Sequence, residues 1–200
     1  MAYGTVWSTG MTPPMTPPTS PRERWLHEGL TVLAELGAPA LRIDRLAERL
    51  TMTKGSFYHH FDGLAGYKSE LLAYFSELST MRYIEAVESQ PDLGPREKLN
   101  RLMSLVLHSP DDEGPLEIAF RAWAQQDPHV HEAQRRIDAI RTDYLRDLCR
   151  GLGLTPRRAL DMARVLYTVL IGSGHIVPPL EPADLRRLWT MTLEVIPPAD

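Results

Sequence analysis

The sequence predicts an all-α protein of about nine helices, and three observations lead to this fold class. Apolar residues recur at helical spacing in one segment after another from residue 20 onwards. Polar capping residues, prolines and glycines mark where these segments begin and end. No stretch alternates between apolar and polar residues in the way that a half-buried strand does.

The first predicted helix begins after Ser20, a capping residue that is followed by Pro21 and, three residues after the cap, by Glu23. Gly37 ends this helix. The second predicted helix, about residues 43–50, carries apolar side chains at positions i, i+3, i+4 and i+7, which is the full signature of one buried helix face.

A very short third helix is predicted over residues 54–60, with Thr53 as its N-cap. A long fourth helix follows over about residues 64–88. Prolines and glycines then delimit five more helices. We expect these between Pro95 and Ser109, over about 116–126, from Pro128 to Gly151, from Pro156 to about Gly172, and from beyond Pro179 to Ile196.

Composition and charge place any nucleic-acid contact in the first third of the chain. The net charge is −4, but residues 21–60 carry six Lys and Arg against five acidic residues, while the rest of the chain is net negative. The single cysteine, Cys149, cannot form an intrachain disulfide, and the N-terminus lacks the pattern of a secretory signal. No apolar stretch approaches the roughly 20 residues of a membrane helix. We therefore expect a cytoplasmic protein without membrane contact.

Three regions follow from this pattern. Residues 1–19 are rich in proline and are expected to form a disordered tail. Residues 20–80 form the N-terminal helical domain, and residues 81–200 form a larger helical domain.

The segment of about residues 42–61 carries the functional information. Two predicted helices are joined there by only three or four residues, and Ala47 is small where they would cross. Phe57 and Phe61 would hold the short helix against the core, which leaves its polar face outward. A short, partner-stabilised helix with a polar outer face suits the reading helix of a helix-turn-helix, which enters the major groove of double-stranded DNA.

The stretch Leu46–Phe61 reads Leu-Ala-Glu-Arg-Leu-Thr-Met-Thr-Lys-Gly-Ser-Phe-Tyr-His-His-Phe. It resembles the recognition segment of the TetR family of helix-turn-helix transcriptional regulators, and the resemblance covers about residues 20–80. It implies a three-helix DNA-binding domain, a linking fourth helix, a C-terminal domain that binds an effector, and a homodimer formed by the last two helices. The expected DNA contacts are Arg45, Thr53, Lys54, Gly55, Ser56, Tyr58, His59 and Lys68.

Two positions depart from the family pattern. The family usually has Gly in the turn where this chain has Thr51, and a β-branched residue does not readily adopt a positive φ, so we expect a distorted turn. The family also usually has a lysine where this chain has Leu64. The nearest cation is Lys68, one helical turn later, and whether it replaces that phosphate contact stays open.

In the C-terminal half, aromatic, Met and Leu positions predict a cavity for an apolar, drug-sized and aromatic molecule. Few charges are expected to face it: Arg121 lies beside the apolar stripe, while Arg135, Arg136 and Arg141 are predicted on the outer face of their helix. The expected ligand contacts are Met103, Leu107, Phe120, Trp123, Tyr144, Leu166, Tyr167, Leu170 and His175. The expected dimer contacts are Leu166, Leu170, Leu185, Leu188, Trp189 and Thr192.

Other function classes have weaker support. Cofactors, metals and catalytic residues are not expected, because phosphate loops, nucleophile elbows and zinc-hydrolase motifs are missing from the sequence. His108 near Asp111 and Asp112 is a minor metal candidate. The acidic run Asp111-Asp112-Glu113 with Glu117 leaves open an α-helical enzyme that retains a helix-turn-helix as scaffold. The sequence also leaves open an activator of the same fold.

Overall fold

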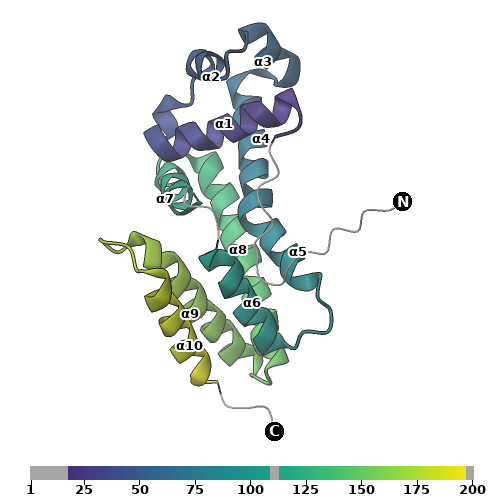
Figure 1. Cartoon of the computed structure of the whole chain (residues 1–200), viewed down its shortest axis with the longest axis vertical. Helices are drawn as coiled ribbons and strands as arrows, with labels where there is room; N and C mark the ends of the chain where they lie inside the picture. Colours follow the sequence, from purple (N-terminus) through teal and green to yellow (C-terminus); the bar gives the residue numbers. More distant parts are fainter. Residues whose placement is uncertain (1–17, 109–112, 197–200) are drawn as a thin grey trace.

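The computed structural model describes residues 18–108 and 113–196, and this part of the chain is helical, without a strand. The proline-rich tail, except for its last residues, and the acidic residues Asp111 and Asp112 lie outside the described residues. Figure 1 shows the first three helices at one end of the molecule and the last two near the opposite end, with a long connecting helix between them.

The N-terminal end forms as its capping residues predict. Ser20 and Glu23 make a reciprocal capping box, and the Thr53 side chain accepts from the Ser56 N–H at 3.2 Å. The helices of this end are α1 (Pro21–Leu36), the 3-10 turn η1 (Ala38–Ala40), α2 (Ile43–Leu50), α3 (Lys54–His60) and α4 (Gly63–Ser76).

An aromatic core holds these helices together. The Phe57 ring lies 5.3 Å from the rings of both Trp25 and Tyr67, and Phe61 packs on the same group. All four rings are buried. The short α3 is therefore fixed by its apolar face, as the sequence predicted.

Thr51 departs from what the sequence predicted. It adopts the left-handed conformation itself, with φ 54° and ψ 40°, and the Met52 N–H still donates to the Ala47 carbonyl. The turn thus keeps its helix-ending geometry, and the β-branched residue carries the strain.

The connecting helix is continuous over the predicted range but changes its winding in the middle. Residues Glu77–Met81 form a π-helical turn between α4 and α5 (Arg82–Glu88), and the Arg82 N–H donates to the Glu77 carbonyl five residues earlier. Counting this helix once, the described residues contain the predicted nine helices.

The remaining helices build a second core. Its buried residues include Leu99, Leu148, Leu166 and Trp189. Within the described residues, no helix is long and apolar enough to cross a membrane. The elements are α6 (Pro95–Leu107), α7 (Glu113–Ala124), α8 (Pro128–Gly151), α9 (Pro156–His175) and α10 (Pro182–Glu194).

Candidate nucleic-acid interface and ligand cavity

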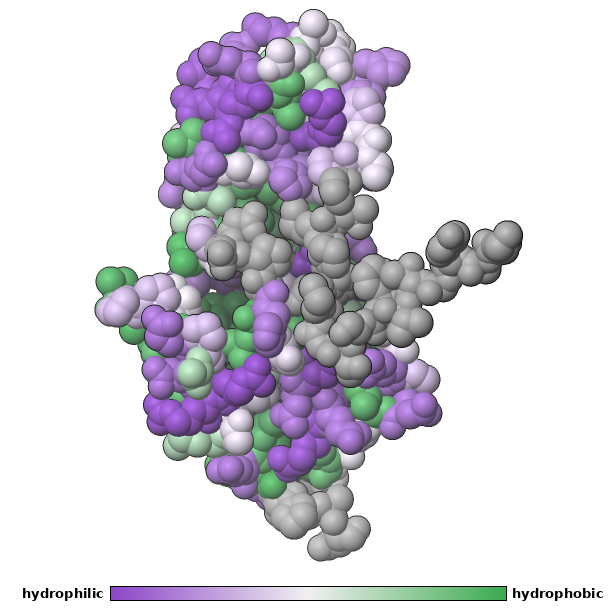
Figure 2. Space-filling model, in the orientation of Figure 1, coloured by the Kyte–Doolittle hydropathy of each residue, from purple (hydrophilic) through white to green (hydrophobic). Residues whose placement is uncertain are grey.

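The outer face of α3 is exposed as predicted. Tyr58 is 60% exposed, and Lys54, Gly55 and His59 are also exposed, while Ser56 is half-buried. Arg45 on α2 is exposed as well. Figure 2 shows that this end of the molecule is largely hydrophilic.

Lys54 does not project freely from this surface. Its ammonium group pairs with the Asp44 carboxylate on α2, and both side chains remain more than half exposed. The hydrogen bond raises the pKa of Lys54 and lowers the pKa of Asp44. A DNA phosphate would compete with this carboxylate for the ammonium group.

Lys68 lies where it serves a different contact. Its Nζ is 5.5 Å from the centre of the Trp123 ring on α7. Lys68 thus links α4 to α7 by a cation–π contact. This contact is within the protein and differs from the phosphate contact that was predicted for Lys68.

A cavity of about 360 Å³ lies between the two ends of the molecule. Its wall is mostly apolar, and Figure 2 shows a recess with hydrophobic residues at its floor between α7 and the α9–α10 hairpin. The volume falls within the range of small-molecule sites, roughly 300–1,000 Å³. Of the predicted ligand contacts, four line this cavity: Tyr144, Tyr167, Leu170 and His175.

The other five predicted ligand contacts do not line it. Phe120 stacks on Phe75 in the N-terminal core, and Trp123 packs beside Phe120. Met103 and Leu166 are buried in the second core, and Leu107 packs against that core. Helical spacing identifies an apolar face, but it does not distinguish the side chains that fill a core from those that border a cavity.

Helix α1 supplies an unexpected wall of the cavity. His27, Leu30, Thr31, Ala34 and Glu35 line it, although they belong to the helix-turn-helix end. The sequence held a signal for this wall: positions 27, 31 and 34 repeat at helical spacing on a second face of the helix, with small and polar residues.

Arg141 corrects another prediction. It points inward rather than outward, and its side chain is only 14% exposed. Its Nη1 donates to both Glu117 carboxylate oxygens at 3.1 Å and to the Tyr167 hydroxyl at 3.2 Å. Arg135 and Arg136 are exposed, as predicted.

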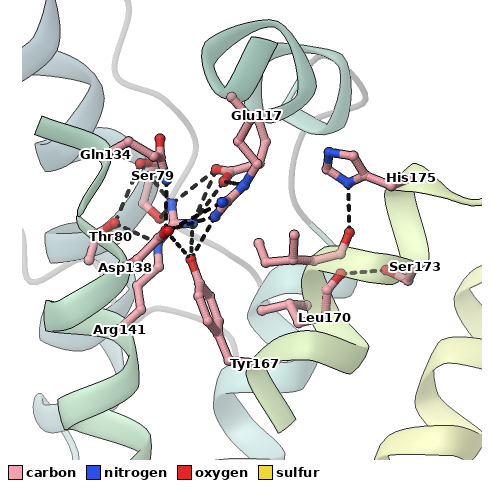
Figure 3. A network of polar contacts seen from close by, with 12 residues as sticks. Ser79, Thr80, Glu117, Gln134, Asp138, Arg141, Tyr167, Leu170, Ser173 and His175 are labelled. Atoms are coloured by element: carbon pink, nitrogen blue, oxygen red, sulfur yellow. Dashed lines mark hydrogen bonds and ion pairs between the residues drawn. The ribbon is translucent and has the colours of Figure 1, made fainter. Parts of the chain in front are cut away.

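Figure 3 shows the polar network that surrounds Arg141. Arg121 donates to Glu117 at 2.8 Å and to Asp138 at 2.8 Å, and the Tyr167 hydroxyl donates to Asp138 at 2.7 Å. The two arginines balance the two carboxylates, so these four groups carry no net formal charge. Glu117, Arg141 and Tyr167 line the cavity, whereas Arg121, Gln134 and Asp138 line a second hollow of about 530 Å³ on the surface.

Burial and the neighbouring charges shift the pKa values of three members of the network: Tyr167, Arg141 and Asp138. Burial raises the pKa of Tyr167 to about 12, so its hydroxyl is a neutral donor. Burial alone would lower the pKa of Arg141, but Glu117 and Tyr167 outweigh it and raise that pKa. Burial likewise opposes a lower pKa for Asp138, but the bonds from Arg121 and Tyr167 prevail and lower it.

Comparison with known proteins agrees with the geometry of the N-terminal end. Residues 26–73 match the model of the tetR family of bacterial regulatory proteins. The chain carries the TetR-family N-terminal domain. No curated protein sequence matches it significantly.

Solved structures extend the TetR-family likeness to the whole fold. A transcriptional regulator from Rhodococcus sp. Rha1 superposes with a TM-score of 0.72 at 19% identity over 88% of this chain and 96% of its own. A TetR transcriptional regulator from Legionella pneumophila gives 0.72 at 12% identity over 90% and 98%. A protein described as a transcriptional regulator from Saccharomonospora viridis, solved in complex with choline, gives 0.70 at 18% identity over 86% and 95%.

The C-terminal helices place the predicted dimer contacts in three environments. Leu166, Leu185 and Trp189 are buried within the core of one chain and are not available to a partner. Leu170 lines the cavity. Leu188 and Thr192 are both half-buried and remain partly accessible.

A second apolar set on the same two helices was missed. Val165 of α9 and Met191 near the end of α10 are 48% and 52% exposed, and Val195 beyond it is 68% exposed. Of the predicted contacts on α10, Leu185 and Trp189 face the core, whereas Leu188 and Thr192 lie at helical spacing with Met191 and Val195 on its outer face. The sequence alone does not show which face of a helix meets the core, so it could not separate the exposed apolar positions from the buried ones.

Proposed function

We propose that this chain is a transcriptional regulator that binds a two-fold symmetric DNA site as a homodimer and releases it when a small, mostly apolar molecule occupies the cavity. The observation that carries this proposal is the double role of α1. Its one face packs in the aromatic core that holds α3, and its other face lines the cavity. A molecule in the cavity would contact the DNA-binding end directly.

The DNA-binding part of the proposal rests on the TetR-family domain and on the exposed face of α3. Lys54, Tyr58 and His59 offer a cation and hydrogen-bonding groups on a helix that protrudes at one end of the molecule. We propose Arg45, Thr53, Gly55 and Ser56 as the further contacts on this surface. Lys68, bound to Trp123, is left out of this set.

The class of ligand follows from the cavity wall. Because the two arginines and two carboxylates of the network already satisfy one another, a charged ligand would find no spare counter-ion there. A neutral molecule with an apolar body, and one hydroxyl or carbonyl group near Tyr167, fits the wall best. The choline bound by the Saccharomonospora viridis relative supports small-molecule binding by this fold, with a different head group.

The homodimer is supported by the exposed apolar side chains of the last two helices. Val165 lies on α9, Met191 on α10 and Val195 directly after it, and these helices would form a four-helix bundle across a two-fold axis. Such a dimer presents two copies of α3, as a symmetric DNA site requires.

An enzyme is a less favoured alternative. Of its acidic candidates, Glu117 is paired with Arg121 and Arg141, so this carboxylate is held in a structural network rather than free for proton transfer. Whether the protein represses or activates its target genes is decided by where its site lies relative to a promoter, and both outcomes use the same molecule.

The test combines DNA selection with a neutral probe. Duplexes enriched from a random pool by the full chain should share an inverted repeat and bind in gel shifts at about 150 mM salt. N-phenyl-1-naphthylamine, an uncharged aromatic dye that brightens in apolar surroundings, should bind the protein and weaken the DNA complex. Ala34→Phe, which projects a ring from α1 into the cavity, should reduce dye binding. Enrichment of no sequence would refute the DNA-binding proposal.

A further inference from the structure

The π turn Glu77–Met81 lies at the border between two packed groups of residues. On one side, Leu71, Leu72 and Phe75 of α4 belong to the N-terminal core. On the other side, Tyr83 and Val87 of α5 form a separate buried cluster with Leu105 of α6. The winding of the connecting helix therefore changes where its packing partners change.

Helix α4 is firmly docked on the DNA-binding end. The Tyr67 hydroxyl donates to the Trp25 carbonyl of α1 at 2.8 Å in a buried hydrogen bond. Gly29 of α1 lies directly against that hydroxyl, because a Cβ at this position would be only 1.9 Å from it. A movement of α4 is thus transmitted to α1 and the helices that pack on it.

One side chain from outside the connecting helix holds the π turn. Arg141 Nη2 donates to the Ser79 carbonyl at 3.1 Å and to its hydroxyl at 3.0 Å, and Arg141 Nε donates to the Thr80 hydroxyl at 2.8 Å. A carbonyl within an ordinary α-helix is taken up by the N–H four residues later. In the widened turn, the Ser79 carbonyl instead accepts a hydrogen bond from Arg141 of α8 (Figure 3).

The same guanidinium group faces the cavity. Its Nη1 is shared by Glu117 of α7 and Tyr167 of α9, and all three residues line the cavity, as do Ser79 and Thr80. A hydrogen-bonding group that competed for Tyr167 or Glu117 would act on the same guanidinium group that binds Ser79 and Thr80 of the π turn.

We propose that the π turn Glu77–Met81 is the adjustable joint of the connecting helix, and that Arg141 is the positioning residue that couples occupation of the cavity to this joint. The inference rests on the proposed function, since it specifies how the cavity acts on the DNA-binding end. A π turn holds one residue more than an α turn of equal length, so its conversion to α-helix changes the register between α4 and α5. Such a two-state element can carry a signal.

Two substitutions test the coupling without removing the cavity. Arg141→Lys keeps the positive charge but loses the planar fork that reaches Ser79, Thr80 and Glu117 together. Thr80→Val keeps the shape of the side chain and removes the acceptor of Arg141 Nε. The matched control is Arg135→Lys on the same helix, because Arg135 is exposed and its bonds go only to Glu132 within the described part of the chain.

The first measurement requires no ligand. Hydrogen exchange of amides 77–82 should become at least about tenfold faster, relative to amides of α1, in Arg141→Lys and Thr80→Val, and should not change in the control. Unchanged relative exchange in both variants would overturn the proposal that Arg141 holds the joint.

The second measurement uses N-phenyl-1-naphthylamine and the selected duplex. In wild type and control, saturating dye should weaken DNA binding by about tenfold, which is within the usual range of coupling between two sites. In both variants this factor should fall toward one when each is measured at a dye concentration that saturates it, with its affinities for dye alone and for DNA alone determined separately. Full coupling in both variants would contradict the role of Arg141.

The readouts separate this inference from the proposed function. Suppose that dye binds and alters exchange at residues 77–82 only where Arg141 is intact, but that DNA is not released. The proposal for the π turn is then supported, and only the proposed release of DNA fails. If dye releases DNA without altering exchange at residues 77–82 in the wild type, the joint is refuted while the proposed function stands.

Discussion

At the scale of single residues, Thr51 shows how a position can keep the geometry of a family turn without the residue that favours it. The left-handed conformation is inexpensive for glycine and costly for a β-branched side chain, by about 1–3 kcal/mol. Thr51 is exposed, so its side chain contributes little packing in return. The turn is therefore imposed by the helices on either side.

This strain predicts a stabilising substitution. Thr51→Gly should raise the free energy of unfolding by about 1 kcal/mol and the melting temperature by about 2–4 °C, because the conformation is native to glycine. Thr51→Ala, which retains a Cβ, should give little of this gain. Thermal unfolding followed by circular dichroism would measure both, and a glycine variant less stable than the alanine variant would contradict the explanation.

The Lys54–Asp44 pair gives a prediction for DNA affinity. Asp44→Asn removes a carboxylate that competes with phosphate for Lys54, so binding to the selected duplex should become tighter by several-fold. Lys54→Ala should weaken binding and reduce the slope of log K against log salt by about one. Glu132→Gln, a carboxylate on α8 that is also paired with arginines, serves as the control and should leave the affinity unchanged. A weaker complex for Asp44→Asn would show that Lys54 needs this partner for its position.

At the scale of helices, the limits of the elements could be predicted and the contacts between them could not. Ser20 and Thr53 cap helices at the residues that the sequence indicates. Capping is local, since it depends on side chains within three residues. The inward turn of Arg141 depends on Glu117, 24 residues earlier, and on Tyr167, 26 residues later, so no local pattern could reveal it.

The same distinction explains which site residues were found. The face of α3 was predictable because the buried Phe57 and Phe61 leave only one outer face on a helix of seven residues. Of the expected ligand contacts, four on α8 and α9 line the cavity, those on α6 and α7 do not, and the wall on α1 was missed. Which apolar residues border an empty space follows only from how three or more helices pack.

The contact between α1 and α4 supports a prediction at this scale. Gly29→Ala should lower the free energy of unfolding by about 1–3 kcal/mol and weaken DNA binding, because its methyl group would meet the Tyr67 hydroxyl. Tyr67→Phe removes that hydroxyl and its bond to the Trp25 carbonyl, at a cost of about 1 kcal/mol. In the double variant the two effects should be less than additive. Additive losses in denaturant unfolding would place the clash elsewhere.

At the scale of the whole molecule, the exposed apolar side chains of α9 and α10 predict the assembly. Met191→Asp places a charge on a surface that one chain leaves open and that two chains would bury. It should yield folded monomers with weak affinity for the inverted repeat. Sedimentation velocity at micromolar concentration distinguishes them from wild-type dimers, and an unaffected dimer would move the interface to another face.

Trp189 provides the contrast that identifies this surface. It lies on the same helix as Met191, yet its side chain is only 1% exposed because it points into the core of one chain. Trp189→Ala should therefore destabilise the fold itself by about 3–5 kcal/mol. Loss of the dimer through this variant would accompany unfolding, whereas loss through Met191→Asp would not.

The shared helix α1 also has a consequence for the behaviour of the protein in a cell. Since one helix borders both the cavity and the fold that would bind DNA, the proposed function would make the small molecule and the DNA reciprocal antagonists that never touch each other. The factor by which the small molecule lowers affinity for DNA must equal the factor by which DNA lowers affinity for the small molecule. The dose of effector for half-maximal response would then rise with the number of occupied genomic sites, so the sensitivity of the sensor would depend on its own targets.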